Sequence, residues 1–258
     1  MKIFSCISII ITLCVHTSCS KKEKIVFESS EFFSQCGLSL EYQDVERYTP
    51  KPGSPFSKQF VKKHSKATGA IGTISVNNRF KSYCSGTLLV GNYFLTAGHC
   101  MVAGVLNDYV VFNYHTGKVP KAYKILSILE HEEVKIGMDY AIMKLDGNPN
   151  KDFGYAKLSQ GGPKLFEPII IFQHPRGKPK QVDTGKLASI GFGHNTYSTL
   201  RYNYLDPEGG SSGAGIYNVQ GELIGVHNKG GCDYRFEHIG GNLGISILSI
   251  REISNILK

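Results

Sequence analysis

Short apolar runs separated by turn residues fill the chain from residue 70 onward, and they limit the folds that it can adopt. The runs are four to seven residues long and rich in β-branched and aromatic side chains, with Gly, Asn or Asp between them. This pattern predicts β-strands. The first set is AIGTISV, GTLLV, YFLTA, YVVFNY, YKILSIL and YAIMKL, and after the turn-rich DGNPNKDFG the second set is PIIIFQ, KLASIGF, TLRYNYL, AGIYNV, ELIGVHN and NLGISIL.

The connections between these runs indicate how the strands are arranged. No segment between them makes a convincing crossover helix, so antiparallel sheets are favoured. The 29 glycines of the chain suit many tight turns. We therefore expect an all-β protein with two β-domains of similar size, closed by a short C-terminal helix. The helix is predicted from a capping box, Ser249 with Glu252, and from apolar residues at helical spacing, which are Ile250, Ile253, Ile256 and Leu257.

The first 19 residues have the features of an export signal. Lys2 supplies a positive charge, and the apolar run from Ile3 to Val15 is too short to span a bilayer. Small residues precede Cys19, which resembles a bacterial lipoprotein cleavage site, although His16 stands where such sites prefer leucine. We expect an extracytoplasmic protein that is secreted, periplasmic or lipid-anchored at the cell surface. A membrane tether through a lipidated Cys19 stays open.

Residues 20–65 differ from the rest of the chain because they lack sustained periodicity and contain a cluster of Pro, Gly and Ser. We interpret them as a pro-segment or tether, which is partly ordered if Cys36 forms a disulfide.

Seven cysteines divide between the leader and the remainder of the chain. Three of them lie in the leader, and four remain, which is an even number that indicates disulfides in an exported protein. Four cysteines permit three pairings. We favour Cys84 with Cys100, which leaves Cys36 with Cys232.

The net charge of +8 raises the question of nucleic-acid binding. The lysines are scattered through the predicted loops and are not interleaved with aromatic side chains. A solvated, mildly basic surface explains them better, so we expect no nucleic-acid partner.

Three segments contain residues with catalytic potential. His99 ends the apolar segment CSGTLLVGNYFLTAGHC; Asp139 directly precedes the predicted strand in GMDYAIMKLD; and Ser212 lies in the glycine-dense DPEGGSSGAGIYN. Taken singly, each has a simpler interpretation: a core histidine, a turn aspartate and an exposed glycine loop. A serine hydroxyl is a poor nucleophile without a base, so their combination carries the functional argument.

The motifs LTAGHC, GMDYAIMKL and GGSSGAG, in this order, resemble those of the chymotrypsin-like serine endopeptidases. The resemblance implies two packed antiparallel β-barrels over residues 66–258 and a protein or peptide substrate. It implies that Ser212 is the nucleophile, that His99 is the general base and that Asp139 orients the imidazole. It also implies an oxyanion hole made by the backbone N–H groups of Gly210 and Ser212.

One departure from the family concerns activation. Trypsin-type zymogens pair a freed amino terminus with an aspartate just before the nucleophile, but Ser211 stands there and carries no charge. Removal of residues 20–65, if it occurs, must therefore act in another way, for example by unblocking the cleft.

The glutamyl-endopeptidase branch looks closest, since ELIGVHNKGG resembles its strand beside the specificity pocket. By this resemblance His227 lines the pocket, and the backbone of Asn228, Lys229 and Gly230 pairs with an extended substrate. Two other positions conflict. Asp206, six residues before Ser212, stands where trypsin-type enzymes select Arg or Lys, and Pro207 stands where the glutamyl branch has Thr or Ser. We expect a preference for acidic side chains; an Asp206–His227 pair that neutralises both is an alternative.

Other functions fit the sequence less well. GGSSG also fits the nucleophile elbow of α/β-hydrolases, with Ser211 as nucleophile, but the chain reads as all-β. HEEVKI at His131 is not a zinc-binding HExxH motif, so we expect no metal and no cofactor. The rival from another class is a catalytically silent relative that uses the scaffold for binding or adhesion. We expect the protein to be a monomer.

Overall fold

The structure is a computed structural model of the 258-residue chain. It describes residue 36 and residues 39–132, 138–192, 198–232 and 241–258. The predicted leader and Cys19 lie outside the described residues, so the export signal and lipidation stay predictions. In the part of the chain that is described, no helix has the length and apolar character needed to cross a membrane.

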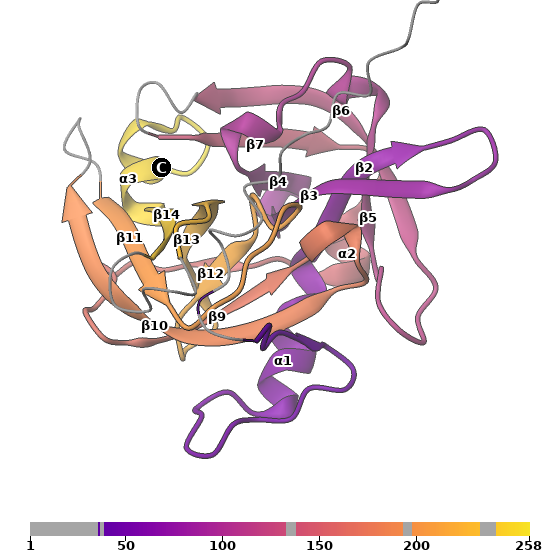
Figure 1. Ribbon diagram of the computed structural model, residues 1–258. Coiled ribbons are helices and arrows are strands. Elements are labelled where there is room, and N and C mark those ends of the chain that lie inside the picture. Colours follow the sequence, from indigo (N-terminus) through magenta and orange to yellow (C-terminus); the bar gives the residue numbers. More distant parts are fainter. Residues whose placement is uncertain (1–35, 37–38, 133–137, 193–197, 233–240) are drawn as a thin grey trace, which may run out of the picture.

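Six antiparallel strands of the first half form a closed barrel with the order β2-β3-β4-β7-β6-β5 (Figure 1). Neighbouring strands pair in antiparallel fashion, with register shifts in the β2–β3 and β6–β7 pairs, and β2 pairs with β5 to close the ring. The strands are β2 (Thr68–Ile74), β3 (Phe80–Leu89), β4 (Tyr93–Thr96), β5 (Tyr109–Phe112), β6 (Lys121–Glu132) and β7 (Tyr140–Leu145).

The second half forms another closed ring of six antiparallel strands, in the order β9-β10-β11-β14-β13-β12, with β12 pairing back to β9. These strands are β9 (Pro168–Gln173), β10 (Gln181–Phe192), β11 (Ser198–Asn203), β12 (Gly215–Tyr217), β13 (Glu222–Lys229) and β14 (Asn242–Ser246). Two short strands are added at the outside, where β1 (Gln43–Asp44) pairs with β10 and β8 (Lys157–Leu158) pairs with β13. The predicted all-β fold with two antiparallel barrels is confirmed.

Alternation along β9 shows how the strand pattern builds two hydrophobic cores. Ile169 and Ile171 are fully buried inside the second barrel. Ile170 and Phe172, which point to the opposite face, join the larger cluster that extends into the first barrel. Successive side chains of a strand point to opposite faces, so a continuous apolar run is what a strand buried on both faces requires.

The helices are few and short. They are α1 (Lys58–His64), α2 (Pro149–Phe153), α3 (Ile247–Ile253) and the 3₁₀ turns η2 (Ser65–Ala67), η3 (Val90–Asn92), η4 (Gly98–Cys100), η5 (Val105–Asn107) and η7 (Pro175–Gly177). Figure 1 shows α3 in yellow, alongside β13 and β14, with which it is in contact.

The C-terminal helix is present, but it begins earlier than predicted. Its N-cap is Ser246, whose hydroxyl accepts a hydrogen bond from the backbone N–H of Leu248. Ser249 therefore lies inside the helix and is buried, so the predicted capping box with Glu252 is wrong. Ser246 is the N-cap because it lies at the end of β14 in an extended conformation, which is the backbone geometry that an N-cap needs.

Part of the segment that we interpreted as a pro-segment or tether is integrated into the fold. Tyr48, Phe56 and Val61 are buried in the larger core cluster. Ser57 caps α1 by accepting from the N–H of Phe60, so a local signal did exist for this unpredicted helix. Cys36 is bonded to Cys232, with Cα atoms 5.0 Å apart, which is the pairing that we favoured. Whether residues 20–65 are removed stays a prediction.

Candidate active site

His99 lies in the η4 turn that follows β4 in the first barrel. Cys100 joins this turn to Cys84 of β3 through a disulfide, with Cα atoms 6.2 Å apart, as we had favoured. Both cysteines are buried, so the link fixes the backbone directly after His99 against β3. The ring itself is accessible, with 38% of the side chain exposed.

Asp139 holds this histidine at two points. Its carboxylate lies 2.9 Å (Oδ2) and 3.1 Å (Oδ1) from His99 Nδ1, and Oδ1 also accepts the backbone N–H of His99 at 2.8 Å. The side chain of Asp139 is only 5% exposed. Its φ of 40° lies in the left-handed region, which Asp tolerates better than most residues, and the next residue begins β7.

Gly98 allows the two residues to approach. A Cβ at this position would overlap the carbonyl oxygen of Glu132 and lie 3.2 Å from Asp139 Oδ1. The glycine in GHC is therefore required mainly by the backbone carbonyl of Glu132, which passes directly beside it at the end of β6.

Ser212 lies in the loop between β11 and β12 of the second barrel, and hydrogen bonds to the first barrel fix this loop. The carbonyl oxygen of Ser212 accepts the N–H of Ser85 at 2.8 Å, and the Ser85 hydroxyl donates to the carbonyl of Gly210 at 2.8 Å. Gly210 and Gly213 have φ values of 94° and 87°. These left-handed conformations explain why glycines surround the serine.

His99 and Ser212 line one pocket, which we call the central pocket. Its volume is about 240 Å³, and its walls come from both barrels. The lining residues are His99, Pro207, Glu208, Gly209, Ser212, His227, Asn228, Lys229 and Gly230. Within the described structure the Ser212 hydroxyl makes no hydrogen bond with the His99 ring, so the two side chains share the pocket without direct contact of this kind.

Two backbone donors are available beside Ser212. The carbonyl oxygen of Gly209 accepts the N–H of Arg176 at 2.6 Å. A trans peptide holds its C=O and the following N–H on opposite sides, so the N–H of Gly210 points away from Arg176. Among the described residues, the N–H groups of Gly210 and Ser212 have no protein acceptor.

The profile of the family described as "Trypsin-like peptidase domain" matches residues 84–226, which is more than half of the chain and includes His99, Asp139 and Ser212. This protein belongs to the trypsin-like peptidase family.

Other similarities agree with this membership. A probable periplasmic serine endoprotease DegP-like of Buchnera aphidicola is 29% identical over 175 residues, which are 61% of this chain and 36% of that protein. The secreted RxLR effector protein 73 of Plasmopara viticola is 31% identical over 102 residues, 37% of this chain and 25% of that protein. The chain thus spans about a third or less of the length of these two relatives.

Solved structures share the fold. The serine endoprotease from Yersinia pestis has a TM-score of 0.59 at 17% identity, covering 81% of this chain and 68% of that one. The active form of the Rv3671c protease from M. tuberculosis has a TM-score of 0.58 at 15% identity, covering 80% and 86%. None of these comparisons singles out the glutamyl-endopeptidase branch.

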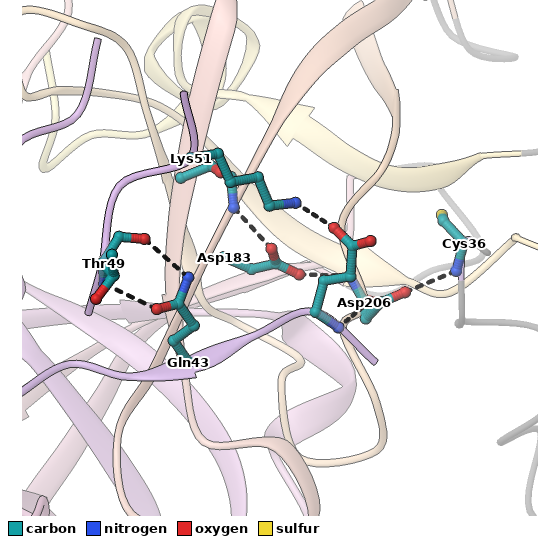
Figure 2. Close-up of polar contacts among 8 residues, drawn as sticks. Cys36, Gln43, Thr49, Lys51, Asp183 and Asp206 are labelled. Carbon is teal, nitrogen blue, oxygen red and sulfur yellow. Dashed lines mark hydrogen bonds and ion pairs between the residues drawn. The ribbon is translucent and has the colours of Figure 1, made fainter. Parts of the chain in front are cut away.

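In this trypsin-like peptidase, Asp206 does not line the central pocket, where we expected it. Its carboxylate is 1% exposed and accepts the backbone N–H groups of Cys36 at 2.7 Å and Glu41 at 2.8 Å (Figure 2). Burial raises the pKa of Asp206, whereas the two N–H donors lower it. The carboxylate turns outward from the pocket because a segment distant in sequence supplies its hydrogen bonds.

His227 does line the central pocket, and it is not paired with Asp206. Its Nδ1 is hydrogen-bonded to the hydroxyl of Tyr202. The ring is 2% exposed, and this burial lowers the pKa of His227 to about 3, helped by the neighbouring His99. The imidazole is therefore neutral at neutral pH. Asn228, Lys229 and Gly230 continue the same wall, and pairing of their backbone with a substrate stays a prediction.

Two residues of the site were not predicted. Glu208 lines the pocket although it is 4% exposed. Its carboxylate contacts Arg176 Nε at 2.7 Å and accepts a hydrogen bond from the hydroxyl of Tyr42 at 2.8 Å. The second is Ser85, whose hydroxyl accepts a hydrogen bond from the N–H of His174 at 2.9 Å. An acidic residue four positions before Ser212 could have indicated that Glu208 belongs to the site. A serine within a predicted strand gives no such indication for Ser85.

A group of three possible metal ligands occurs in the described structure beside the pocket, formed by Cys84, His99 and Cys100. The disulfide uses both sulfur atoms, so neither cysteine can bind a metal as a thiolate. This group is therefore not a metal site.

Proposed function

We propose that this trypsin-like peptidase is an active serine endopeptidase in which Ser212 attacks the scissile carbonyl, His99 is the general base and Asp139 orients the imidazole. The observation that supports this most is the double hydrogen bond from His99 to Asp139. Because Nδ1 faces the carboxylate, Nε2 is the ring nitrogen left for a hydroxyl in the central pocket. In free enzymes the distance between the catalytic hydroxyl and the imidazole nitrogen is commonly longer than a hydrogen bond. A substrate that fills the pocket would bring the Ser212 hydroxyl and His99 Nε2 into hydrogen-bond distance.

The reaction then follows from these positions. His99 Nε2 takes the proton of Ser212 as Oγ bonds to the carbonyl carbon, and the imidazolium gains stabilisation from Asp139. The N–H groups of Gly210 and Ser212 stabilise the oxyanion. His99 returns the proton to the leaving amine, and an acyl-enzyme remains. Water then attacks this ester by the same proton route and releases the acid.

We propose further that the residue before the scissile bond is acidic. Asp206, the feature that would select Arg or Lys, is directed at the N-terminal segment. His227 and the positively charged Lys229 line the pocket instead, and Arg176 compensates the carboxylate of Glu208. Cleavage of a peptide library by the purified enzyme tests this: enrichment of Glu or Asp supports it, and enrichment of Arg or Lys contradicts it.

The two disulfides support an extracytoplasmic location, because such bonds persist in oxidising compartments. The similarity to a protein named as a periplasmic endoprotease agrees with this. We propose that proteins or peptides in that compartment are the substrates, and that Cys19 is either a lipid anchor or part of a cleaved leader.

Labelling with a fluorophosphonate, which reacts with activated serines, tests the proposed mechanism. We expect a covalent adduct in the wild type and none in Ser212→Ala. Ser211→Ala is the matched control, because Ser211 is fully buried and its hydroxyl has no hydrogen-bond partner among the described residues. It should label like the wild type. A folded wild type that does not label would favour the rival, a silent binding or adhesion protein.

A further inference from the structure

The segment formed by residue 36 and residues 39–44, here called the strap, is attached to the second barrel by several kinds of contact. Cys36 is bonded covalently to Cys232. The N–H groups of Cys36 and Glu41 donate to the carboxylate of Asp206, as Figure 2 shows for Cys36. At its end the strap adds β1 to the edge of β10, where Gln43 lies opposite Val182. These attachments make the strap part of the barrel wall.

Asp206 depends on the strap for its hydrogen bonds. The carboxylate is almost wholly buried, and in the described structure no lysine, arginine or histidine forms an ion pair with it. Its backbone N–H is used separately, donating to Asp183 Oδ2 at 2.8 Å. A buried carboxylate without donors is costly, so loss of the strap would force Asp206 to take up a proton or turn towards water. Either change acts on Pro207, the next residue, which lines the central pocket.

A second line of contacts runs from the strap to the backbone beside Ser212. The hydroxyl of Tyr42 donates to Glu208, and Glu208 contacts Arg176 Nε. The backbone N–H of Arg176 holds the carbonyl of Gly209, and this bond directs the N–H of Gly210 away from Arg176. The carbonyl of Glu208 also accepts the N–H of Ser211 at 2.9 Å. The strap thus supports the loop on both sides of the proposed oxyanion site.

We propose that the strap is a permanent activating element of this enzyme and that Asp206 and Tyr42 are its positioning residues. They act on catalysis through Pro207, Glu208 and Gly209 and do not touch the substrate. The strap is therefore needed for activity, and its loss would inactivate the enzyme. This inference rests on the proposed peptidase function.

The test compares Tyr42→Phe with Tyr83→Phe. Each variant removes one tyrosine hydroxyl that donates to a carboxylate at 2.8 Å, Glu208 in the first case and Asp108 in the second. We expect Tyr42→Phe to lower kcat/KM on a peptide substrate about tenfold, since hydrogen bonds to charged groups carry about this effect, mainly through kcat. Tyr83→Phe should leave kcat/KM unchanged at a similar loss of thermal stability, because its hydroxyl does not contact the loop beside Ser212. Equal activity of both variants would overturn the proposal.

Asp206→Asn provides the second arm. The amide can accept only one of the two N–H groups of the strap and presents its own NH₂ to the other. We expect a larger fall in kcat/KM than for Tyr42→Phe, with partial rescue in Asp206→Glu.

Amide hydrogen exchange separates a failure of this proposal from a failure of the peptidase function, because it needs no activity. In the Ser212→Ala background, Asp206→Asn should speed exchange in the peptide that contains Ser211 and Ala214, whose N–H groups donate to Glu208 and Ser211. Tyr83→Phe should leave it unchanged. Unchanged exchange in Asp206→Asn would refute support of the loop by the strap, whether or not the wild type cleaves peptides.

Discussion

The carboxylate of Asp139 receives two hydrogen bonds from the same residue, one from the ring Nδ1 of His99 and one from its backbone N–H. The contact fixes both the position of the η4 turn and the orientation of the imidazole. Because the carboxylate is buried and the ring is accessible, the free edge of the ring faces the central pocket. This geometry leads to the first prediction.

Asp139→Asn should lower kcat by about 10⁴ while leaving the fold intact. The Asn oxygen can still accept the backbone N–H of His99, but its NH₂ group then faces Nδ1 and favours the wrong imidazole tautomer. Peptide hydrolysis and thermal unfolding measure the two effects. Asp146→Asn is the control, since Asp146 also accepts a backbone N–H, that of Lys124, outside the pocket. Activity of Asp139→Asn within about tenfold of the wild type would contradict the assigned role of Asp139.

Gly213→Ala should destabilise the protein much more than Gly104→Ala. Both glycines have a φ of 87°, so in both substitutions the left-handed conformation costs about 1 kcal/mol or slightly more. A Cβ at Gly104 meets nothing within 4 Å, whereas one at Gly213 would overlap Thr96 and the carbonyl of Ser85. We expect a loss of about 1 kcal/mol for Gly104→Ala and about 3 kcal/mol or more for Gly213→Ala. Urea unfolding measures the free energy of unfolding of both variants. Equal losses would show that the space between the barrels at Gly213 can accept a methyl group.

Removal of the Cys84–Cys100 disulfide, by substituting both cysteines with Ala, should lower the free energy of unfolding by about 3 kcal/mol. The bond closes a short loop between residues 16 positions apart, and its loss raises the conformational entropy of the unfolded chain. Denaturant midpoints of the oxidised wild type and the double variant give the difference. Activity should fall too, because Cys100 is adjacent to His99. A stability change below about 1 kcal/mol would mean that the surrounding core alone holds the η4 turn.

His174 predicts a pH dependence of stability. It is fully buried, its Nε2 has no partner among the described residues, and burial lowers the pKa of His174 to about 3. The unfolded chain takes up this proton near pH 6.5, so the associated stability is present above 6.5 and is lost as the pH falls towards 3. His174→Phe keeps an aromatic ring stacked on Tyr114 but has no group that takes up a proton. The variant should therefore not lose this part of its stability at low pH.

Urea unfolding of both proteins between pH 7.5 and pH 4.5 tests the dependence. At the upper end the variant should be less stable by about 1 kcal/mol, since it lacks the hydrogen bond from Nδ1 to the carbonyl of Lys178. Below pH 6.5 the wild type should lose up to about 1.4 kcal/mol per pH unit relative to the variant. Parallel curves would show that His174 takes up its proton over the same pH range in the folded and the unfolded protein. His227 shares the lowered pKa, but it is present in both proteins and its effect cancels.

The strand segments and the Cys84–Cys100 disulfide follow patterns that are short in range, whereas Cys36 and Cys232 were the cysteines left over. Alternating or continuous apolar runs with glycine turns are local properties, and they predicted the strands and two β-domains; the barrels were implied by the family resemblance and are confirmed. The limits of the helices were harder to predict from the sequence. Helix α1 was not predicted, and α3 is capped by Ser246 because the end of β14 holds that residue in an extended conformation.

The candidate site shows the same division. His99, Asp139 and Ser212 could be named from motifs, and the structure brings His99 into contact with Asp139 and into one pocket with Ser212. The direction of Asp206 could not be named, because it is decided by N–H groups that lie 165 and 170 residues away along the chain. Glu208 likewise obtains its partners from Tyr42 and Arg176.

The sequence alone determined the all-β class, the favoured Cys84–Cys100 pair and the residues with catalytic potential, since these depend on side-chain type and on spacing between near neighbours. The tertiary structure decided which acidic groups face the central pocket and which hold the N-terminal segment. A carboxylate turns towards the donors that compensate its burial, and only the folded chain brings those donors together.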